Sequence, residues 1–158
     1  MNMFCYQCEQ TAKGTGCTAY GACGKDPETA DLQDLLIYAI KDIARYAHGA
    51  RELGVTDRDV NVFTVKALFS TLTNVNFDLG RFQEFMRQAA VIRDKALVMY
   101  ENACKKTGKD PEQFDCEVEW WLAVDDLSEL DREGESLSIQ RRIGNLGDDI
   151  AGLQELIT

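Results

Sequence analysis

The sequence predicts an all-α protein: an antiparallel three-helix bundle with a cysteine-rich, cluster-binding loop at its N-terminus and the start of a second, similar bundle at its C-terminus. Three observations support this prediction. Long segments repeat apolar residues at helical spacing. Short polar turns separate these segments, as in antiparallel bundles. Four of the six cysteines lie at the start of the chain, at Cys5, Cys8, Cys17 and Cys23.

The first helix is expected within residues 25–54. Asp26, Pro27 and Glu28 favour a helix start, because they supply a capping acceptor, a proline suited to the first turn and an acidic group near the positive end of the helix dipole. Gly54 suits a helix stop. The inner face is expected to carry Leu32, Leu35, Leu36, Ala39, Ile40, Ile43, Ala47 and Ala50.

Two further helices are expected over residues 57–76 and 78–108. Asp57 or Asp59 would cap the second helix, and Gly108 would end the third. The predicted apolar stripe of the second helix comprises Val60, Phe63, Ala67, Leu68 and Leu72. That of the third helix comprises Leu79, Phe82, Met86, Ala89, Ala96, Met99 and Ala103.

Residues 109–147 have a weaker pattern and are expected to form a partly ordered connector that lies on the bundle. The segment CEVEWW (116–121) has some strand character, and DDLSELDREGES (125–136) favours a short helix, followed by a turn rich in Gly, Asn and Asp. Trp120 and Trp121 are expected to pack this connector onto the bundle.

The segment ADLQDLL at residues 30–36 recurs as AGLQELI at residues 151–157. The repeat predicts that residues 148–158 begin a second helical bundle that is cut short, which makes the sequence the front part of a longer protein. The alternative is a coincidental match on a C-terminal helix. The predicted organisation is a cysteine-rich loop (1–27), a three-helix bundle (28–108), a connector (109–147) and the truncated start of a second bundle (148–158).

The net charge of −10 at pH 7 argues against binding nucleic acid or an anionic membrane surface, since both rely on Lys and Arg. No apolar run is long enough to span a membrane, and the start of the chain does not resemble a signal peptide. These features predict a cytoplasmic protein. In that compartment thiols stay reduced, so clustered cysteines favour metal binding over disulfides.

The four N-terminal cysteines have the spacing C-x2-C-x8-C-x5-C. A disulfide framework, a structural zinc ion and an iron–sulfur cluster are the competing interpretations. Zinc sites usually place a longer stretch between two C-x2-C pairs. An iron–sulfur cluster fits better, because a loop can wrap around a large cluster in uneven steps, and Gly14, Gly16, Gly21 and Gly24 allow such wrapping. These features favour [4Fe–4S] and leave [2Fe–2S] open.

The residues MFCYQCEQTAKGTGC…GACGKDPETADLQDLLIYAIK resemble the N-terminus of the hybrid cluster protein family, also called prismane proteins or hydroxylamine reductases. The resemblance covers the whole chain but only the front part of a family member. It implies that Cys5, Cys8, Cys17 and Cys23 bind a [4Fe–4S] cluster in an electron-transfer domain. It also implies that the full-length protein reduces hydroxylamine to ammonia, with nitric oxide reduction as a related proposal.

The family's reaction takes place at a hybrid iron–sulfur–oxygen cluster, whose ligands belong to later domains. This chain has none of those motifs, so no catalytic residue is assigned, and the segment alone is not expected to reduce hydroxylamine. The resemblance implies an electron-donating reductase or ferredoxin-like partner, besides the remaining domains. The alternative from another functional class is a zinc-stapled helical binding module without a redox role.

Several other residues have a mainly structural interpretation. His48, the only histidine, is expected near the C-terminal end of the first helix, where its charge would favour the helix dipole. Cys104 and Cys116 have no ligand-type spacing and are expected to be packing residues. The aromatic residues Phe4, Tyr6 and Tyr20 interleave with the cysteines, so they would either shield a cluster from water or pack into the core.

Overall fold

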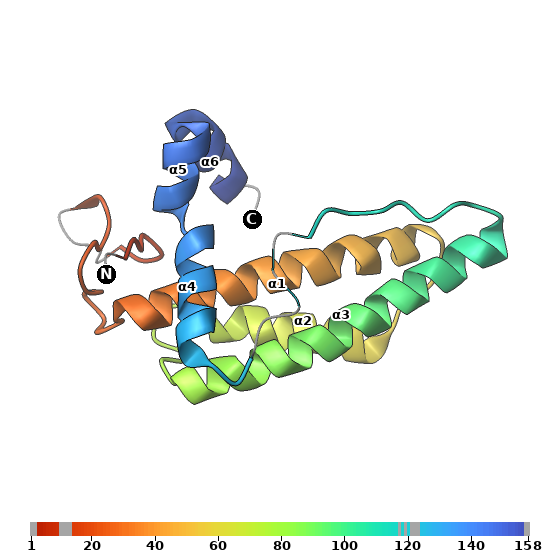
Figure 1. Cartoon of the computed structure of the whole chain (residues 1–158), viewed down its shortest axis with the longest axis horizontal. Coiled ribbons are helices and arrows are strands. Elements are labelled where there is room, and N and C mark those ends of the chain that lie inside the picture. Colours follow the sequence, from red (N-terminus) through yellow and green to blue (C-terminus); the bar gives the residue numbers. More distant parts are fainter. Residues whose placement is uncertain (1–2, 10–13, 117, 119, 121–123, 157–158) are drawn as a thin grey trace.

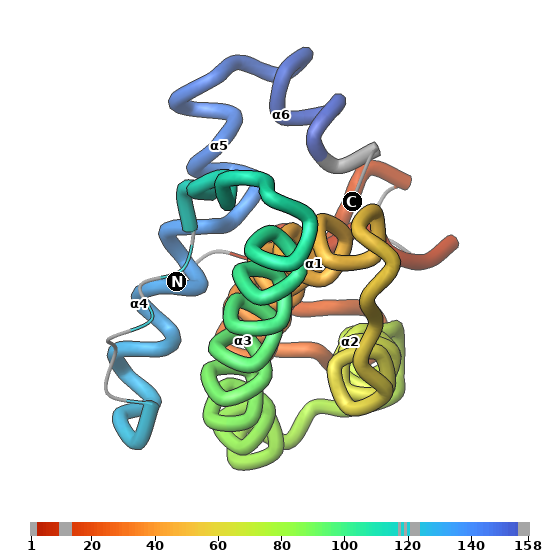
Figure 2. Tube along the Cα trace, turned by 90° about the vertical axis from the view of Figure 1, so that its right-hand side faces the viewer, coloured from red at the N-terminus to blue at the C-terminus, as the bar shows by residue number. Residues whose placement is uncertain are grey.

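Figure 1 shows the computed structural model, which describes residues 3–9, 14–116, 118, 120 and 124–156. These residues form six helices and no β-strand, so the all-α prediction is confirmed for the described part of the chain. Helices α1 (Pro27–Glu52), α2 (Arg58–Ser70) and α3 (Leu79–Thr107) lie side by side along the long axis and alternate in direction. Seen from the end, α2 lies on one side of α1 and α4 (Leu127–Leu137) on the other (Figure 2).

Both ends of α1 follow the sequence prediction. The Asp26 carboxylate accepts a hydrogen bond from the Thr29 backbone N–H at 2.8 Å, and Pro27 occupies the first turn. At the other end the chain leaves the helix through Gly54, whose φ of 80° lies in the left-handed region that favours glycine. Of the predicted inner face, only Ala47 is half-buried, and the other members are buried in the main core.

Helix α2 is shorter than predicted and buries a narrower face. Asp57, one of the two predicted caps, precedes the helix. The helix ends at Ser70, whereas the prediction extended it to residue 76. Val60 and Phe63 are buried as predicted, as is Ala67. The prediction was wrong for Leu68 and Leu72, which are 42% and 51% exposed. Leu72 lies beyond the end of the helix, and much of Leu68 stays in contact with solvent.

Helix α3 begins and ends as predicted. The Asp78 carboxylate accepts a hydrogen bond from the Arg81 backbone N–H at 3.1 Å, and Gly108 ends the helix with a φ of 68°. Most of its predicted stripe is buried, while Leu79 and Met99 are half-buried at the edge of the core.

The buried carboxylate of Asp42 on α1 holds the connector. It accepts hydrogen bonds from the Trp120 Nε1–H at 3.1 Å and from the Val118 backbone N–H at 3.4 Å. The Arg45 guanidinium lies 3.1 Å from the same carboxylate and also donates to the backbone carbonyl of Asp115. The predicted packing role of Trp120 is therefore confirmed, while Trp121 lies outside the described residues.

The connector is more helical than the sequence suggested. The short helix predicted over 125–136 is present as α4. Where strand character was predicted, Cys116, Val118 and Trp120 lie outside regular structure. Helix α5 (Ile139–Leu146) follows directly, where a connector and turn were expected. This prediction was wrong because Ile139, Ile143 and Leu146 have helical spacing.

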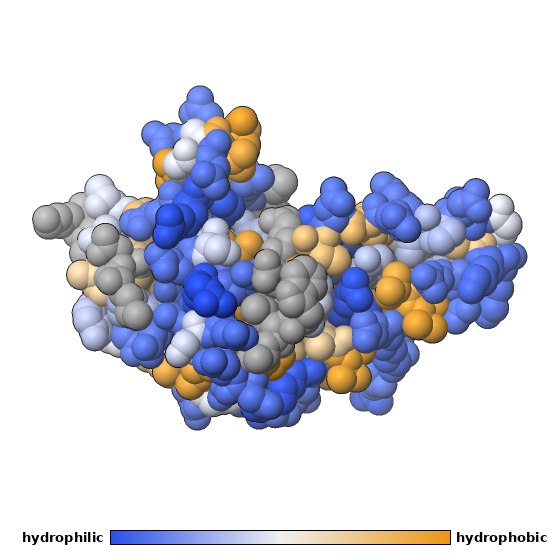
Figure 3. Space-filling model, in the orientation of Figure 1, coloured by the Kyte–Doolittle hydropathy of each residue, from blue (hydrophilic) through white to orange (hydrophobic). Residues whose placement is uncertain are grey.

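The repeated segment near the C-terminus lies in helix α6 (Asp148–Leu156), although Ile157 is outside the described residues. Ala151 is buried, but Ile150 and Leu153 are 52% and 61% exposed. Figure 3 shows apolar side chains on the surface at this α5–α6 end, above an otherwise largely hydrophilic face. In the described part of the chain, no helix combines the length and apolar character of a membrane span.

Gly134 allows α4 to cross α1 in close contact. A Cβ at this position would overlap the backbone carbonyl of Asp31. We therefore expect Gly134→Ala to lower the free energy of unfolding by roughly 1–3 kcal/mol through overpacking, although alanine favours helices over glycine. Urea unfolding followed by circular dichroism measures this change. Gly144→Ala on α5 is the matched control, since its Cβ would meet no atom. Equal stability of both variants would contradict this helix contact.

Asp31 makes the stability of the α1–α4 contact dependent on pH. Burial, followed by repulsion from the Asp131 and Glu135 carboxylates, raises the pKa of Asp31 from 3.8 to about 7. The folded state disfavours the charged form of this carboxyl. The contribution of Asp31 to the free energy of unfolding is therefore highest below about pH 4, falls as the pH rises to about 7 and is constant above that.

We expect Asp31→Asn to stabilise the protein at about pH 8 by at most a few kcal/mol, since one pKa unit corresponds to about 1.4 kcal/mol. This advantage should disappear in acid, where the wild-type carboxyl is neutral. Unfolding curves across the pH range measure the difference, and Asp110→Asn in the exposed connector serves as the control. A pH-independent difference would contradict the burial of a charged group at Asp31.

Candidate functional site

The N-terminal loop brings Cys5 and Cys17 together through its backbone. The Cys5 N–H donates to the Cys17 carbonyl at 3.0 Å, and the Cys17 N–H donates to the Cys5 carbonyl at 2.8 Å. Residues paired in this antiparallel manner project their side chains from the same face. Two of the four predicted ligand residues, far apart in the loop sequence, therefore lie side by side.

This paired segment is anchored on the beginning of α1. Met3, Cys17 and Ala30 form a small buried cluster, against which the half-buried Cys5 packs. Gly16 is required beside it, because its φ is 146° and a Cβ there would lie 2.7 Å from the Phe4 ring. Gly16, one of the glycines predicted to allow wrapping, thus permits a close approach between the two arms of the loop.

The turn that contains Cys23 contacts Cys17 through its backbone. The Gly21 N–H donates to the Lys25 carbonyl at 2.8 Å, and the Gly24 N–H donates to the Gly21 carbonyl at 2.9 Å. Within this turn the Ala22 N–H donates to the Cys17 sulfur at 3.4 Å. The Cys23 sulfur lies 3.0 Å from where a Gly21 Cβ would be, so a side chain at residue 21 would press on this thiol.

Lys25 is a member of the site that the sequence pattern does not reveal. Its side chain is buried, and its Nζ lies 3.5 Å from the Cys5 sulfur and 3.3 Å from the Gln7 amide oxygen. It also donates to the amide oxygen of Gln33 on α1. In the sequence, only its position between the fourth cysteine and the Asp26 cap could have pointed to Lys25. That position does not predict burial, because lysine is normally solvent-exposed.

The four predicted ligand residues are only partly brought together. Cys17 is buried, while Cys5, Cys8 and Cys23 are half-buried, and no disulfide is present among the described residues. Among the described residues, no three His, Cys, Asp or Glu side chains form a group that could hold a metal ion. The thiol donors still fit an iron–sulfur cluster. The Cys5 and Cys17 sulfurs lie within hydrogen-bonding distance of protein N–H donors. Hydrogen bonds of this kind to cluster sulfurs influence the reduction potential of the cluster.

The aromatic residues of the loop do not form a core. Phe4 and Tyr6 are in contact, with ring centroids 5.6 Å apart, but Tyr6 is 46% and Tyr20 is 66% exposed. The core-packing alternative is therefore wrong for both tyrosines. The Phe4 ring instead lies against Gly16, next to the paired Cys17.

The other singled-out residues lie away from the loop. His48 is exposed beside Arg51, near the C-terminal end of α1. Cys104 is buried in the core, as expected for a packing residue. Cys116 is exposed, contrary to that expectation, and its sulfur accepts a hydrogen bond from the Arg93 guanidinium at 3.6 Å.

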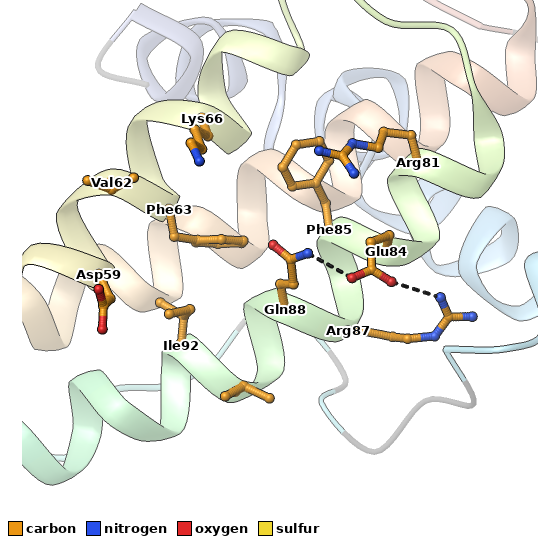
Figure 4. Close-up of a pocket in the computed structure, with 11 residues that line it drawn as sticks. Asp59, Val62, Phe63, Lys66, Arg81, Glu84, Phe85, Arg87, Gln88 and Ile92 are labelled. Atoms are coloured by element: carbon orange, nitrogen blue, oxygen red, sulfur yellow. Dashed lines mark hydrogen bonds and ion pairs between the residues drawn. The ribbon is translucent and has the colours of Figure 1, made fainter.

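A groove of about 570 Å³ lies between α2 and α3, and Figure 4 shows the side chains that line it. Phe63 and Phe85 form its apolar floor. Along one wall the Glu84 carboxylate accepts hydrogen bonds from Gln88 at 2.7 Å and from Arg87 at 3.3 Å. No cysteine lines this groove, so it is separate from the cysteine loop.

Comparison with known proteins gives a match over nearly all of this chain. The model of the Prismane/CO dehydrogenase family matches residues 3–158. A hydroxylamine reductase of Rhodospirillum rubrum is 43% identical over 155 residues, which are 98% of this chain and 28% of that protein. A hydroxylamine reductase of Halothermothrix orenii is 40% identical over 161 residues, with 100% of this chain and 28% of that protein covered.

A third relative, the hydroxylamine reductase of Syntrophobacter fumaroxidans, is 61% identical over 93 residues, or 59% of this chain and 17% of that protein. The first two relatives show that the chain spans about 28% of the length of these proteins. Because the family model covers almost every residue, from the paired cysteines to α6, the chain belongs to the Prismane/CO dehydrogenase family.

Proposed function

We propose that Cys5, Cys8, Cys17 and Cys23 hold a [4Fe–4S] cluster, through which this segment accepts single electrons and passes them to the rest of a longer protein. The observation that carries the proposal is the backbone pairing of Cys5 with Cys17, together with protein N–H donors beside both sulfurs. Membership of the Prismane/CO dehydrogenase family supports it independently. When bound, the cluster would supply one-electron redox chemistry.

The residues of the chain would bind and tune that group. The Ala22 N–H would direct its dipole at the Cys17 sulfur, and Lys25 would place a positive charge beside the Cys5 sulfur. Both contacts favour a negatively charged site. Met3 and Ala30 close one side of the loop with apolar atoms, which limits access of water to Cys17. No side chain of the segment needs to act as an acid or a base.

The longer protein would reduce hydroxylamine, which takes up two electrons and two protons to give ammonia and water. The names of the relatives support this reaction, and nitric oxide reduction is a related candidate. The electrons would come from a reductase or a ferredoxin-like protein. They would leave this segment for a hybrid iron–sulfur–oxygen cluster bound by the other domains, of which residues 148–158 would begin the next helical bundle.

Metal and sulfide analysis after anaerobic purification tests the cluster directly. We expect about four iron and four sulfide per chain and an absorption band at roughly 400 nm that bleaches on reduction. Serine at Cys5, Cys8, Cys17 or Cys23 should remove most of the iron and sulfide, because each substitution deletes one thiolate. Cys116→Ser is the matched control and should retain both, since its exposed thiol lies outside the loop.

Two results would contradict this assignment. A colourless wild-type chain with one bound zinc ion and no sulfide would favour a zinc-stapled helical binding module. Full retention of iron and sulfide after substitution of any one of the four loop cysteines would remove that residue from the ligand set.

We also expect the 158-residue chain, loaded with its cluster, not to turn over hydroxylamine. The physical reason is that the proposed cluster only carries electrons, whereas hydroxylamine must bind where its N–O bond is broken. Ammonia production with a chemical reductant measures the activity, and protein-free buffer with the same reductant is the control. Ammonia formed above this background would place a reaction centre in this segment.

A further inference from the structure

We infer that Lys25 is a positioning residue of the proposed cluster site, whose buried positive charge holds the Cys5 sulfur and raises the reduction potential of the bound cluster. This inference rests on the proposed function. The main observation behind it is that Lys25 is only 2% exposed and that its Nζ lies 3.5 Å from the Cys5 sulfur. Lysine is rarely buried to this degree unless its charge has a partner.

The hydrogen bonds of Lys25 define where its ammonium points. An ammonium has three N–H donors and no acceptor. Its acceptors here are the Cys5 sulfur, the Gln7 amide oxygen at 3.3 Å and the Gln33 amide oxygen. All three donors are therefore used, and the charge is held between the loop and α1.

The amide partners are themselves held by a third part of the chain, the turn between α2 and α3. Gln33 is buried on α1 and donates from its Nε2 to the Asn76 carbonyl at 3.3 Å. The Gln7 amide oxygen also lies 3.5 Å from the Thr73 hydroxyl. Figure 1 shows this turn at the same end of the molecule as the N-terminal loop. The position of the ammonium thus depends on contacts from three segments.

The groups around Lys25 indicate which opposite charge would stabilise its ammonium. Within the described part of the chain, no carboxylate lies within ion-pair distance of its Nζ, and its partners are two neutral amides and one sulfur. A buried charge without an opposite charge is costly. A metal-bound thiolate at Cys5, on a cluster of net negative charge, would supply that opposite charge.

The same contact predicts a direction for the reduction potential. Reduction brings one electron from an external reductant to the site and breaks no protein bond. A positive charge close to the sulfur stabilises the added negative charge, and hydrogen bonds and net charge near the sulfurs are known determinants of cluster potentials. Removal of the Lys25 charge should therefore make the cluster harder to reduce.

The test is a redox titration of the anaerobically loaded 158-residue chain, followed by electron paramagnetic resonance and by the visible band. Lys25→Met and Lys25→Gln remove the charge, Lys25→Arg retains it, and Lys105→Met removes a charge from the exposed far end of α3 as the control. We expect the neutral variants to shift the reduction equilibrium at least tenfold toward the oxidised form, which is 59 mV for one electron. Lys25→Arg should shift it less, and Lys105→Met should not shift it.

The iron and sulfide contents and the reduction potentials of these variants support or overturn the role of Lys25. A neutral variant that retains wild-type iron, sulfide and reduction potential overturns it. If both neutral variants lose iron and sulfide while Lys25→Arg keeps them, the charge is required to hold the cluster, which supports it. Loss in all three variants, with helical structure intact, assigns Lys25 a role in packing only and overturns it. A wild-type chain that takes up no sulfide instead overturns the proposed function itself, and the inference with it.

Discussion

Burial of helix α1 is the constraint on which the rest of the structure depends. It contacts α2, α3 and α4, and its first turn is covered by the cysteine loop. Its apolar residues fill the core with Phe82 of α3 and Phe63 of α2. A helix covered on so many sides also buries polar side chains, and each of these requires a partner because burial without one is costly.

The buried polar side chains of α1 are where the surrounding segments attach. Gln33 accepts from Lys25 and donates to the α2–α3 turn, which ties the cysteine loop to the helices. Two and a half turns further along, Asp42 accepts from Val118 and Trp120 and holds the connector. Asp31, two residues before Gln33, faces acidic residues of α4, and burial together with these charges raises its pKa. The same helix thus organises the candidate site, the connector and α4.

This arrangement explains how an acidic chain can present a locally positive contact to a sulfur. The net charge of −10 is carried mostly by exposed groups, where water screens it. Lys25 acts inside the protein, next to Cys5 and away from solvent, where one charge has a larger effect. A reduction potential set by Lys25, as proposed, would depend on the local packing of the loop rather than on the overall charge of the protein.

The sequence predicted much of the fold from local rules. Asp26, Asp57 and Gly108 mark helix ends because caps and left-handed glycines act within a few residues. Helical spacing likewise identified the buried faces of α1 and α3. The rule failed at Leu68 and Leu72, because periodicity shows that a face is apolar but not whether another helix covers it.

By itself, the sequence determined that the chain is helical, where α1 and α3 begin and end, and that four cysteines fall within one glycine-containing segment at the start of the chain. Only the tertiary structure decided that Cys5 lies opposite Cys17 and that the Lys25 ammonium is buried against the Cys5 sulfur. The physical reason is that caps and periodicity are properties of neighbouring residues. The surroundings of Lys25 depend instead on Gln7, Gln33 and, through them, the α2–α3 turn, which only folding brings together.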